Sequence, residues 1–344
     1  MAVPRLTVII IRMSFFAVLF ALLIEQFKPL PRLDWAHDTL VSWLQWTGRN
    51  FNAGQDRHAW VVWSVTALFP ALLTWGLYAL IAQWSVILAL LFNVGVLYLT
   101  LGFRQFSHYF TDIRDALERG DEFEARRLLA SWRHIEAGEL PRTELMRHVI
   151  EHSLLAAHRH MFGVFFWFVL MSTLGFGPTG AVLYRMAEFS ARHWASRNAV
   201  IGAPPNDRLS ELSQQLFSVL DYVPARLTAF GFAVVGNFEE AVTCWRRDAA
   251  LWKDGNEGVL LSAAAGAVGV QLGGSGPTMA SPSPPLLVVP IDGAIDVEDV
   301  MSQGATPGLP PQLGHLRSIV GLVWRSVVLW MLLVALLSLA HLVG

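Results

Sequence analysis

Residues 59–103 decide the fold: they read AWVVWSVTALFPALLTWGLYALIAQWSVILALLFNVGVLYLTLGF and contain no Asp, Glu, Lys or Arg. About 20 apolar residues cross a bilayer as a helix, so this stretch is long enough for two crossings. We place the two spans at residues 60–81 and 84–103, with a tight turn at Ala82-Gln83. A helical hairpin suits a membrane because each helix satisfies its own backbone hydrogen bonds.

Composition supports a membrane class for the whole chain. Of its 344 residues, 54% are hydrophobic and only 15% are charged, and the formal net charge is -2. These values argue against a disordered chain, a nucleic-acid partner and most soluble enzymes. The single cysteine, Cys244, excludes an intramolecular disulfide and a multi-cysteine metal site.

Further apolar segments extend this pattern toward both ends of the chain. A span is expected at residues 162–184, interrupted in its second half by glycines and Pro178, and another at 326–342. A first span near 6–24 carries Arg12 close to its middle, which is unfavourable in a bilayer, so Met13 is an alternative start. Two weaker segments, 227–235 and 258–274, fit either membrane-associated helices or helices packed within the protein.

The predicted fold is therefore an all-α, polytopic integral membrane protein with a polar helical hairpin and a loop before the last span. Basic residues flank the 60–103 segment on both sides and are absent from its turn, so both flanking loops are expected in the cytoplasm, at a bacterial inner membrane. Lipid is the first expected partner. The expected regions are membrane helices at 1–103, a polar helical hairpin at 104–160, a membrane and ligand region at 161–275, a Gly/Pro-rich loop at 276–316, and a final membrane helix at 317–344.

Two short patterns could carry chemistry. His148-Val-Ile-Glu151-His152 matches a zinc-peptidase pattern, but histidines on a polar amphipathic helix explain it better, and no metal ligand is assigned. The other pattern is LDYVPAR at residues 220–226. Here Asp221 could cap a helix that begins at Pro224, which leaves Arg226 at a membrane boundary to bind a phosphate or reach the headgroups.

Several motifs together resemble the CobD/CbiB family of cobalamin biosynthesis. They are the hairpin IRDALERGDEFEARRLLASW (113–132), GAVLYR (180–185), LDYVPARLTAF (220–230), and WRRDA followed by NEGVLLSAAAGAVGVQLGG within 245–274. The resemblance implies an adenosylcobinamide-phosphate synthase, which joins an aminopropanol phosphate to adenosylcobyric acid at the cytoplasmic membrane face. It also implies ATP and Mg²⁺ if that activity is retained, and a corrinoid precursor or a cobalamin-pathway protein as partner. The substrate-binding residues that it suggests are Glu151, Tyr184, Arg185, Asp221, Arg226 and Asn256.

The chain departs from the synthase pattern where the family has carboxylates or other polar groups. Leu155, Ala156, Arg159, Ala191 and Leu261 stand at those positions, and catalytic residues are not assigned. Mg²⁺ prefers oxygen ligands, so we expect a degenerate catalyst that performs the synthase reaction inefficiently, with Glu188 and Glu151 able to replace at most two lost groups. Residues 158–167, HRHMFGVFFW, instead resemble AmpE, so the alternative is a non-enzymatic membrane regulator or scaffold. The retained residues Glu151, Asp221, Arg226 and Asn256 are expected to converge on one cavity.

Overall fold

The computed structural model describes residues 15–25, 34–51, 56–101, 103–133, 140–198, 207–274 and 306–343. These residues form helices, with one isolated bridge between Val270 and Leu309. The helix that begins at Phe15 ends at Glu25. The other helices, in chain order, are α2 (Asp34–Phe51), α3 (Asp56–Trp63), η1 (Ser64–Leu68), α4 (Phe69–Trp84), α5 (Val86–Thr100), α6 (Phe103–Glu118), α7 (Glu122–Arg133), α8 (Arg142–Ala157), η2 (His158–Phe162), α9 (Gly163–Thr173), α10 (Thr179–Asn198), α11 (Asp207–Val235), α12 (Phe238–Asp248), η3 (Ala249–Leu251), α13 (Gly255–Val268) and α14 (Leu313–Val343).

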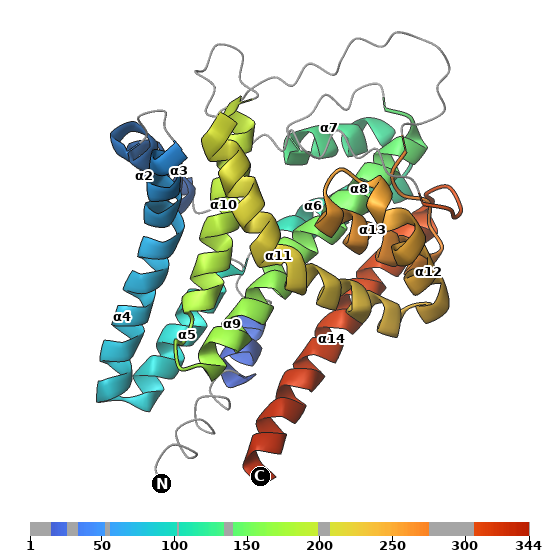
Figure 1. Cartoon of the computed structure of the whole chain (residues 1–344). Helices are drawn as coiled ribbons and strands as arrows, with labels where there is room; N and C mark the ends of the chain where they lie inside the picture. Colours follow the sequence, from blue (N-terminus) through green and yellow to red (C-terminus); the bar gives the residue numbers. More distant parts are fainter. Residues whose placement is uncertain are drawn as a thin grey trace.

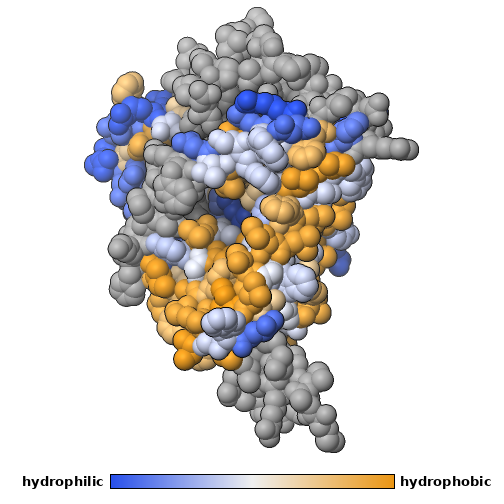
Figure 2. All heavy atoms as spheres, turned by 90° about the vertical axis from the view of Figure 1, so that its left-hand side faces the viewer, coloured by the Kyte–Doolittle hydropathy of each residue, from blue (hydrophilic) through white to orange (hydrophobic). Residues whose placement is uncertain are grey.

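Four helices are long and apolar enough to cross a membrane: His58–Trp84, Arg142–Thr173, Arg208–Val235 and Leu313–Ala340. Their number and the absence of strands among the described residues confirm the prediction of an all-α, multi-pass membrane protein. Figure 2 shows the expected division of the surface, with a hydrophobic zone below a strongly hydrophilic end. Large apolar side chains on α4 and α5 are exposed there, as lipid-facing residues would be.

The helices differ from the predicted spans in three places. The first hairpin turns at Ser85 instead of Ala82-Gln83, and α5 has only 15 residues, or about 22 Å, which is short for a full crossing. The predicted span at 162–184 is wrong: Arg142–Thr173 forms one helix, and the chain reverses at residues 174–178 before α10. Gly175 and Gly177 have positive φ angles of 87° and 60°, which glycine adopts without strain, and they make this reversal possible.

The segment 258–274 contains α13, whose 14 residues are too few to cross a bilayer. Its side chains are almost all buried, and it packs against α11 and α12. Added Cβ atoms at Gly258 and Gly266 would collide with the backbone at Ala249 and Glu240, so these small residues allow the close packing. The sequence alternative of a helix packed within the protein therefore describes this segment.

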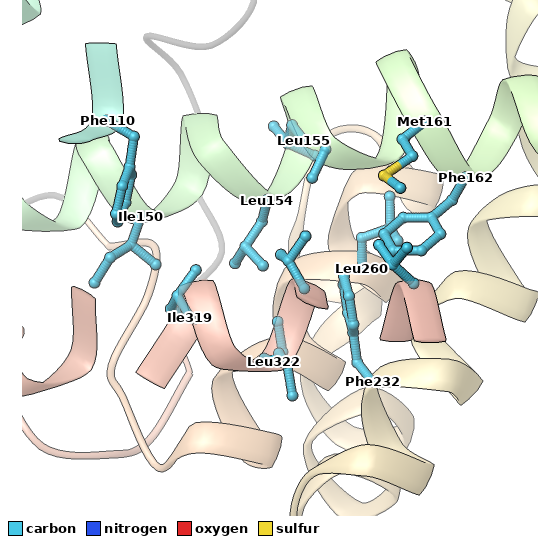
Figure 3. Close-up of a cluster of buried hydrophobic side chains, with 14 of the residues drawn as sticks. Phe110, Ile150, Leu154, Leu155, Met161, Phe162, Phe232, Leu260, Ile319 and Leu322 are labelled. Atoms are coloured by element: carbon cyan, nitrogen blue, oxygen red, sulfur yellow. The ribbon is translucent and has the colours of Figure 1, made fainter. Parts of the chain in front are cut away.

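The largest core joins the polar end to the membrane helices. Figure 3 shows Leu154 and Ile150 of α8 facing Ile319 and Leu322 of α14, with Phe232 of α11 and Leu260 of α13 in the same cluster. These side chains have exposed fractions of 0–1%. Because α8 continues through η2 into α9, this contact holds the membrane helix and its polar extension in one orientation (Figures 1 and 3).

Several predicted features lie outside the described residues. They include Arg12 and Met13, and most of the Gly/Pro-rich loop, of which the structure describes residues 306–312. Thr306 and Leu309 pair with residues 269–272, through Thr306 N to Leu272 O at 2.8 Å and Gln271 N to Leu309 O at 2.9 Å. The last helix begins at Leu313, earlier than residue 317.

A first prediction concerns topology. In Figure 1, α2 and α7 lie at one end of the bundle and the α4–α5 turn lies at the other. Cysteines introduced as Arg49→Cys and Glu124→Cys should therefore react with a membrane-impermeant maleimide from the same side, and Ser85→Cys from the opposite side. The measurement is labelling of intact against permeabilised cells.

The labelling experiment uses a Cys244→Ala background as its control. The native thiol is 2% exposed, and burial raises the pKa of Cys244, so its own reactivity is expected to be low. Labelling of Arg49→Cys and Glu124→Cys from different sides would contradict the arrangement.

Candidate functional site

Asp221 is the centre of the candidate site. Its Oδ1 accepts a hydrogen bond of 2.7 Å from the Tyr184 hydroxyl and lies 2.8 Å from Nε2 of His158. The three side chains come from α11, α10 and η2 and are 4%, 0% and 1% exposed. A buried carboxylate is costly unless it is hydrogen-bonded, so Asp221 fixes the relative positions of these three segments.

The other ring nitrogen of His158 extends the network. Its Nδ1 lies 3.0 Å from Oγ1 of Thr228, which is fully buried two helical turns beyond Asp221 on α11. In a neutral imidazole, Nε2–H donates to the carboxylate and Nδ1 accepts from the hydroxyl. His158 thus bridges two points of α11 that lie on either side of Pro224.

Pro224 lies inside α11, so the prediction that Asp221 caps a helix starting at this proline is wrong. Proline has no N–H, which leaves the carbonyl of Leu220 without its helical donor. The indole Nε1 of Trp167, on α9, donates to that carbonyl at 3.1 Å. One residue of α9 therefore compensates the break that Pro224 makes in α11.

Arg226 and Asn256 meet beside this break. Arg226 Nη1 donates to Asn256 Oδ1 at 3.0 Å and to the Tyr222 carbonyl at 2.9 Å, and its guanidinium stacks 3.4 Å from the centre of the Tyr222 ring. Asn256 Nδ2 donates to the carbonyl of Ser218 at 2.8 Å. Arg226 is partly exposed at this point, so its guanidinium lies at the edge of the buried network.

Glu151 lies on α8, about two turns before His158 of η2. Its Oε1 accepts from the backbone N–H of Gly273 at 2.7 Å, and Arg147 Nε lies 3.9 Å from the same oxygen. His148 Nδ1 lies 3.8 Å from the other oxygen. These contacts assign Glu151 a role in holding residues 270–274 against α8.

Arg185 belongs to a second charged group on α10. Its Nη1 lies 3.0 Å from Oε2 of Glu188, and Arg192 Nε lies 3.4 Å from Oε1. Glu188 is 2% exposed and thus stands between two guanidinium groups. Arg159 of η2 forms an ion pair with Glu257 of α13.

The residues at the other positions of departure from the synthase pattern are apolar and enclosed. Leu155, Ala156, Ala191 and Leu261 have exposed fractions of 1–7%. Among the described residues, no group of three or more His, Cys, Asp and Glu is arranged to hold a metal ion. The nearby carboxylates already have partners within the protein: Asp221 accepts from His158 and Tyr184 through Oδ1, and Glu188 and Glu257 are paired with arginines. The residues present therefore do not fit a Mg²⁺ site.

Sequence reasoning missed three residues of this site, His158, Trp167 and Thr228. The available signal was Pro224. If a helix continues through a proline, a carbonyl in the preceding turn loses its helical N–H donor and requires a donor from elsewhere. The π-helical segment η2 was not predictable in the same way, although such segments are frequent at functional sites.

A second prediction tests the compensation at Pro224. Trp167→Phe should lower the free energy of unfolding by about 1–3 kcal/mol, because the partly buried Leu220 carbonyl loses its donor. The measurement is denaturant-induced unfolding in detergent. Trp60→Phe is the control, since Trp60 is 52% exposed on α3. Equal effects of the two substitutions would contradict a specific role of Trp167.

A third prediction concerns the space for Tyr184. A Cβ at Gly163 would collide with the phenol ring and hydroxyl of Tyr184, so Gly163→Ala should displace Tyr184 from Asp221. We expect a thermal unfolding midpoint lower than that of the wild type. Gly95→Ala, where no atom lies within 4 Å of the added Cβ, should leave the midpoint unchanged or raise it. An unchanged midpoint in Gly163→Ala would show that Tyr184 is not held as described.

Comparisons with known proteins identify relatives of this chain. The family model described as CobD/Cbib protein matches residues 15–282. A relative from Stutzerimonas stutzeri, "Cobalamin biosynthesis protein CobD", is 30% identical over 288 residues, which cover 83% of this chain and 84% of that protein. A protein of the same name from Chromobacterium violaceum is 31% identical over 201 residues, covering 56% of this chain and 60% of that protein. No solved structure matches.

Proposed function

This chain belongs to the CobD/CbiB family of cobalamin biosynthesis proteins, and from that premise we propose that it binds a pathway intermediate at the membrane without efficient ligation. The resembling synthases join aminopropanol phosphate to adenosylcobyric acid in an ATP-dependent amide ligation. This chain has the helical fold proposed to carry that reaction, but Leu155, Ala156, Arg159, Ala191 and Leu261 stand where the synthases are expected to have polar groups. The proposed location is the bacterial inner membrane, with the polar end of the bundle in the cytoplasm.

The observation that carries the proposal is that Asp221 and Glu188 are both paired with side chains of the protein itself. Asp221 is bonded to His158 and Tyr184, and Glu188 is paired with two arginines. Metal-assisted phosphoryl transfer relies on oxygen ligands that hold the ion and neutralise developing charge. No such set is free in the described site, so inefficient ligation is the expected consequence.

The site still offers groups that can hold a polar ligand at the membrane boundary. Arg226 is anchored by Asn256 and stacked on Tyr222, with part of its surface exposed. Arginine recognises phosphate groups bidentately, and an anchored guanidinium loses less entropy on binding. A phosphorylated or corrinoid intermediate is therefore the proposed ligand, and another cobalamin-pathway protein the proposed partner.

A fourth prediction follows for a synthase-deletion strain. The strain expresses this chain and is supplied with cobyric acid. Its rate of cobyric acid conversion should be at least about 100-fold below that given by an intact synthase, because each lost metal ligand removes several kcal/mol of transition-state stabilisation. Cobinamide already carries the aminopropanol group and serves as the positive control for growth. The readout is cobalamin-dependent growth at matched membrane expression.

Growth equal to that given by the intact synthase would overturn the proposal. Absence of rescue, together with binding of a labelled corrinoid precursor by the purified protein, would support it. Absence of both rescue and corrinoid binding would instead favour the AmpE-like regulator, whose resemblance rests on residues 158–167.

A further inference from the structure

Helix α11 is long and apolar enough to cross a membrane, but length alone does not place its two ends. It begins beside α3, where Leu209 packs in one buried cluster with Leu44 of α2. Figure 1 shows this start at the end of the bundle that holds α2 and α7. The last turn of α11 lies beside α12, well above the lower end of α14 in that view. The helix therefore starts at the polar end of the bundle and stops short of the other end.

The chain returns to the polar end after α11 without a helix that could recross the membrane. All residues from 236 to 274 are described, and the longest helices among them are α12, with 11 residues, and α13, with 14. At about 1.5 Å per residue, neither spans the roughly 30 Å of a bilayer core. At the end of this stretch the N–H of Gly273 donates to Glu151 of α8. The next described helix, α14, has Arg317 near its start, paired with Glu118 of α6. Both ends of α11 therefore lie on one side.

The contact between α11 and α14 indicates how deep α11 reaches. A Cβ on Gly231 would lie 3.4 Å from Nε1 of Trp330. The ring of Phe162 lies 6.0 Å from the rings of both Phe232 and Trp330. Trp330 is about 7.5 Å along α14 from Arg325, its last Arg, Lys, Asp or Glu, and roughly 20 Å of helix remains before α14 ends. The second half of α11 therefore lies at the depth of a single leaflet.

The exposed side of α11 changes from polar to apolar along its length. Near its start the exposed residues are polar: Arg208, Glu211 and Gln215. Near its end they are large and apolar, and they continue onto the first residue of α12. We call these the apolar face: Leu227, Phe230, Val234 and Phe238, with exposed fractions of 41–52%. The first three are spaced by three and four residues, which places them on one side of the helix, and the rings of Phe230 and Phe238 are 6.2 Å apart.

Polar groups frame the apolar face at both ends. Arg226 stacks on Tyr222 just before it, and both arginine and tyrosine side chains reach from apolar surfaces to lipid headgroups. Glu239 and Glu240 follow Phe238 directly and are exposed. Carboxylates are costly in hydrocarbon, so the chain has left the bilayer core at that point. An apolar face bounded in this way is typical of helices that lie in the membrane interface.

We propose that α11 does not cross the membrane and that its apolar face inserts among the acyl chains of one leaflet, the leaflet on the side of α2 and α7. Lipid is the occupant because the face adjoins a surface that already faces lipid. Trp330, which contacts α11, is followed on α14 by Leu332 and Leu333, which are 54% and 53% exposed. This placement puts Arg226 at the level of the headgroups, and it holds whichever ligand the protein binds.

A cysteine at Glu239 separates a returning helix from a crossing one. In a Cys244→Ala background, Glu239→Cys should react with a membrane-impermeant maleimide from the same side as Glu124→Cys of α7. Ser85→Cys, in the α4–α5 turn, is the control for the opposite side. Reaction of Glu239→Cys from the side of Ser85→Cys would overturn the proposal, because α11 would then cross the bilayer.

Spin labels on the apolar face identify what covers it. Single cysteines at Phe230→Cys and Val234→Cys carry a nitroxide in phosphatidylcholine nanodiscs, and collisions with O₂ and with a water-soluble nickel chelate are measured. Both labels should favour O₂, as Leu333→Cys on α14 should, because O₂ concentrates in the acyl chains. Phe123→Cys, on α7 and 79% exposed, is the control in water and should favour nickel.

Two other outcomes of the spin-label experiment would contradict the proposal. A preference for nickel at Phe230→Cys and Val234→Cys would place the apolar face in water. Protection of both labels from both reagents would show that a protein partner or a second copy of the chain covers it. Two positions are labelled so that misfolding of one variant, detected by thermal unfolding, leaves the other to decide.

Discussion

A buried carboxylate inside a bundle of membrane helices must be neutralised by its neighbours, and Asp221 imposes that requirement on three segments at once. Tyr184 of α10 and His158 of η2 both bond to Oδ1, and His158 also reaches Thr228. Removing one partner of a buried charged group typically costs about 3–5 kcal/mol. The arrangement of η2, α10 and α11 therefore depends on a small set of hydrogen bonds around one oxygen atom.

The break in α11 at Pro224 belongs to the same arrangement. It frees the Leu220 carbonyl, which the Trp167 indole satisfies, and Asn256 adds a donor at Ser218. Both donors come from helices packed against α11, and the Trp167 indole supplies the hydrogen bond that Pro224 cannot make. Arg226 and Asn256 meet beside Pro224 at the edge of the buried network, where Arg226 is partly exposed.

The same kind of internal pairing involves two of the residues on which the expected difference from the synthases depends. Glu188, which the sequence suggested as a replacement ligand, lies between Arg185 and Arg192. Arg159 takes a position expected for a carboxylate and pairs with Glu257. At both positions a guanidinium group therefore accompanies the carboxylate.

Sequence periodicity predicted the membrane class, whereas other features depended on tertiary contacts. The convergence of four residues on one cavity stays a prediction: Arg226 and Asn256 are in contact, but Glu151 contacts Gly273. The apolar run at 162–184 contained the glycines that reverse the chain, yet composition alone cannot say whether a glycine bends a span or ends it. The capping role expected of Asp221 failed because α11 continues through Pro224, with Trp167 as the donor. Glu151 shares a helix with His158, but its partner Gly273 lies in a segment far along the chain, which no local pattern reveals.

The central claim is that the carboxylates of this site serve the protein's own structure instead of a metal ion. Mn²⁺ replaces Mg²⁺ in most oxygen sites and is visible by electron paramagnetic resonance. We expect Mn²⁺ and ATP to give the same spectrum in three samples: in buffer alone, with the purified chain in nanodiscs, and with Asp221→Asn in nanodiscs. A distinct protein-bound Mn²⁺ signal that disappears in Asp221→Asn would contradict it.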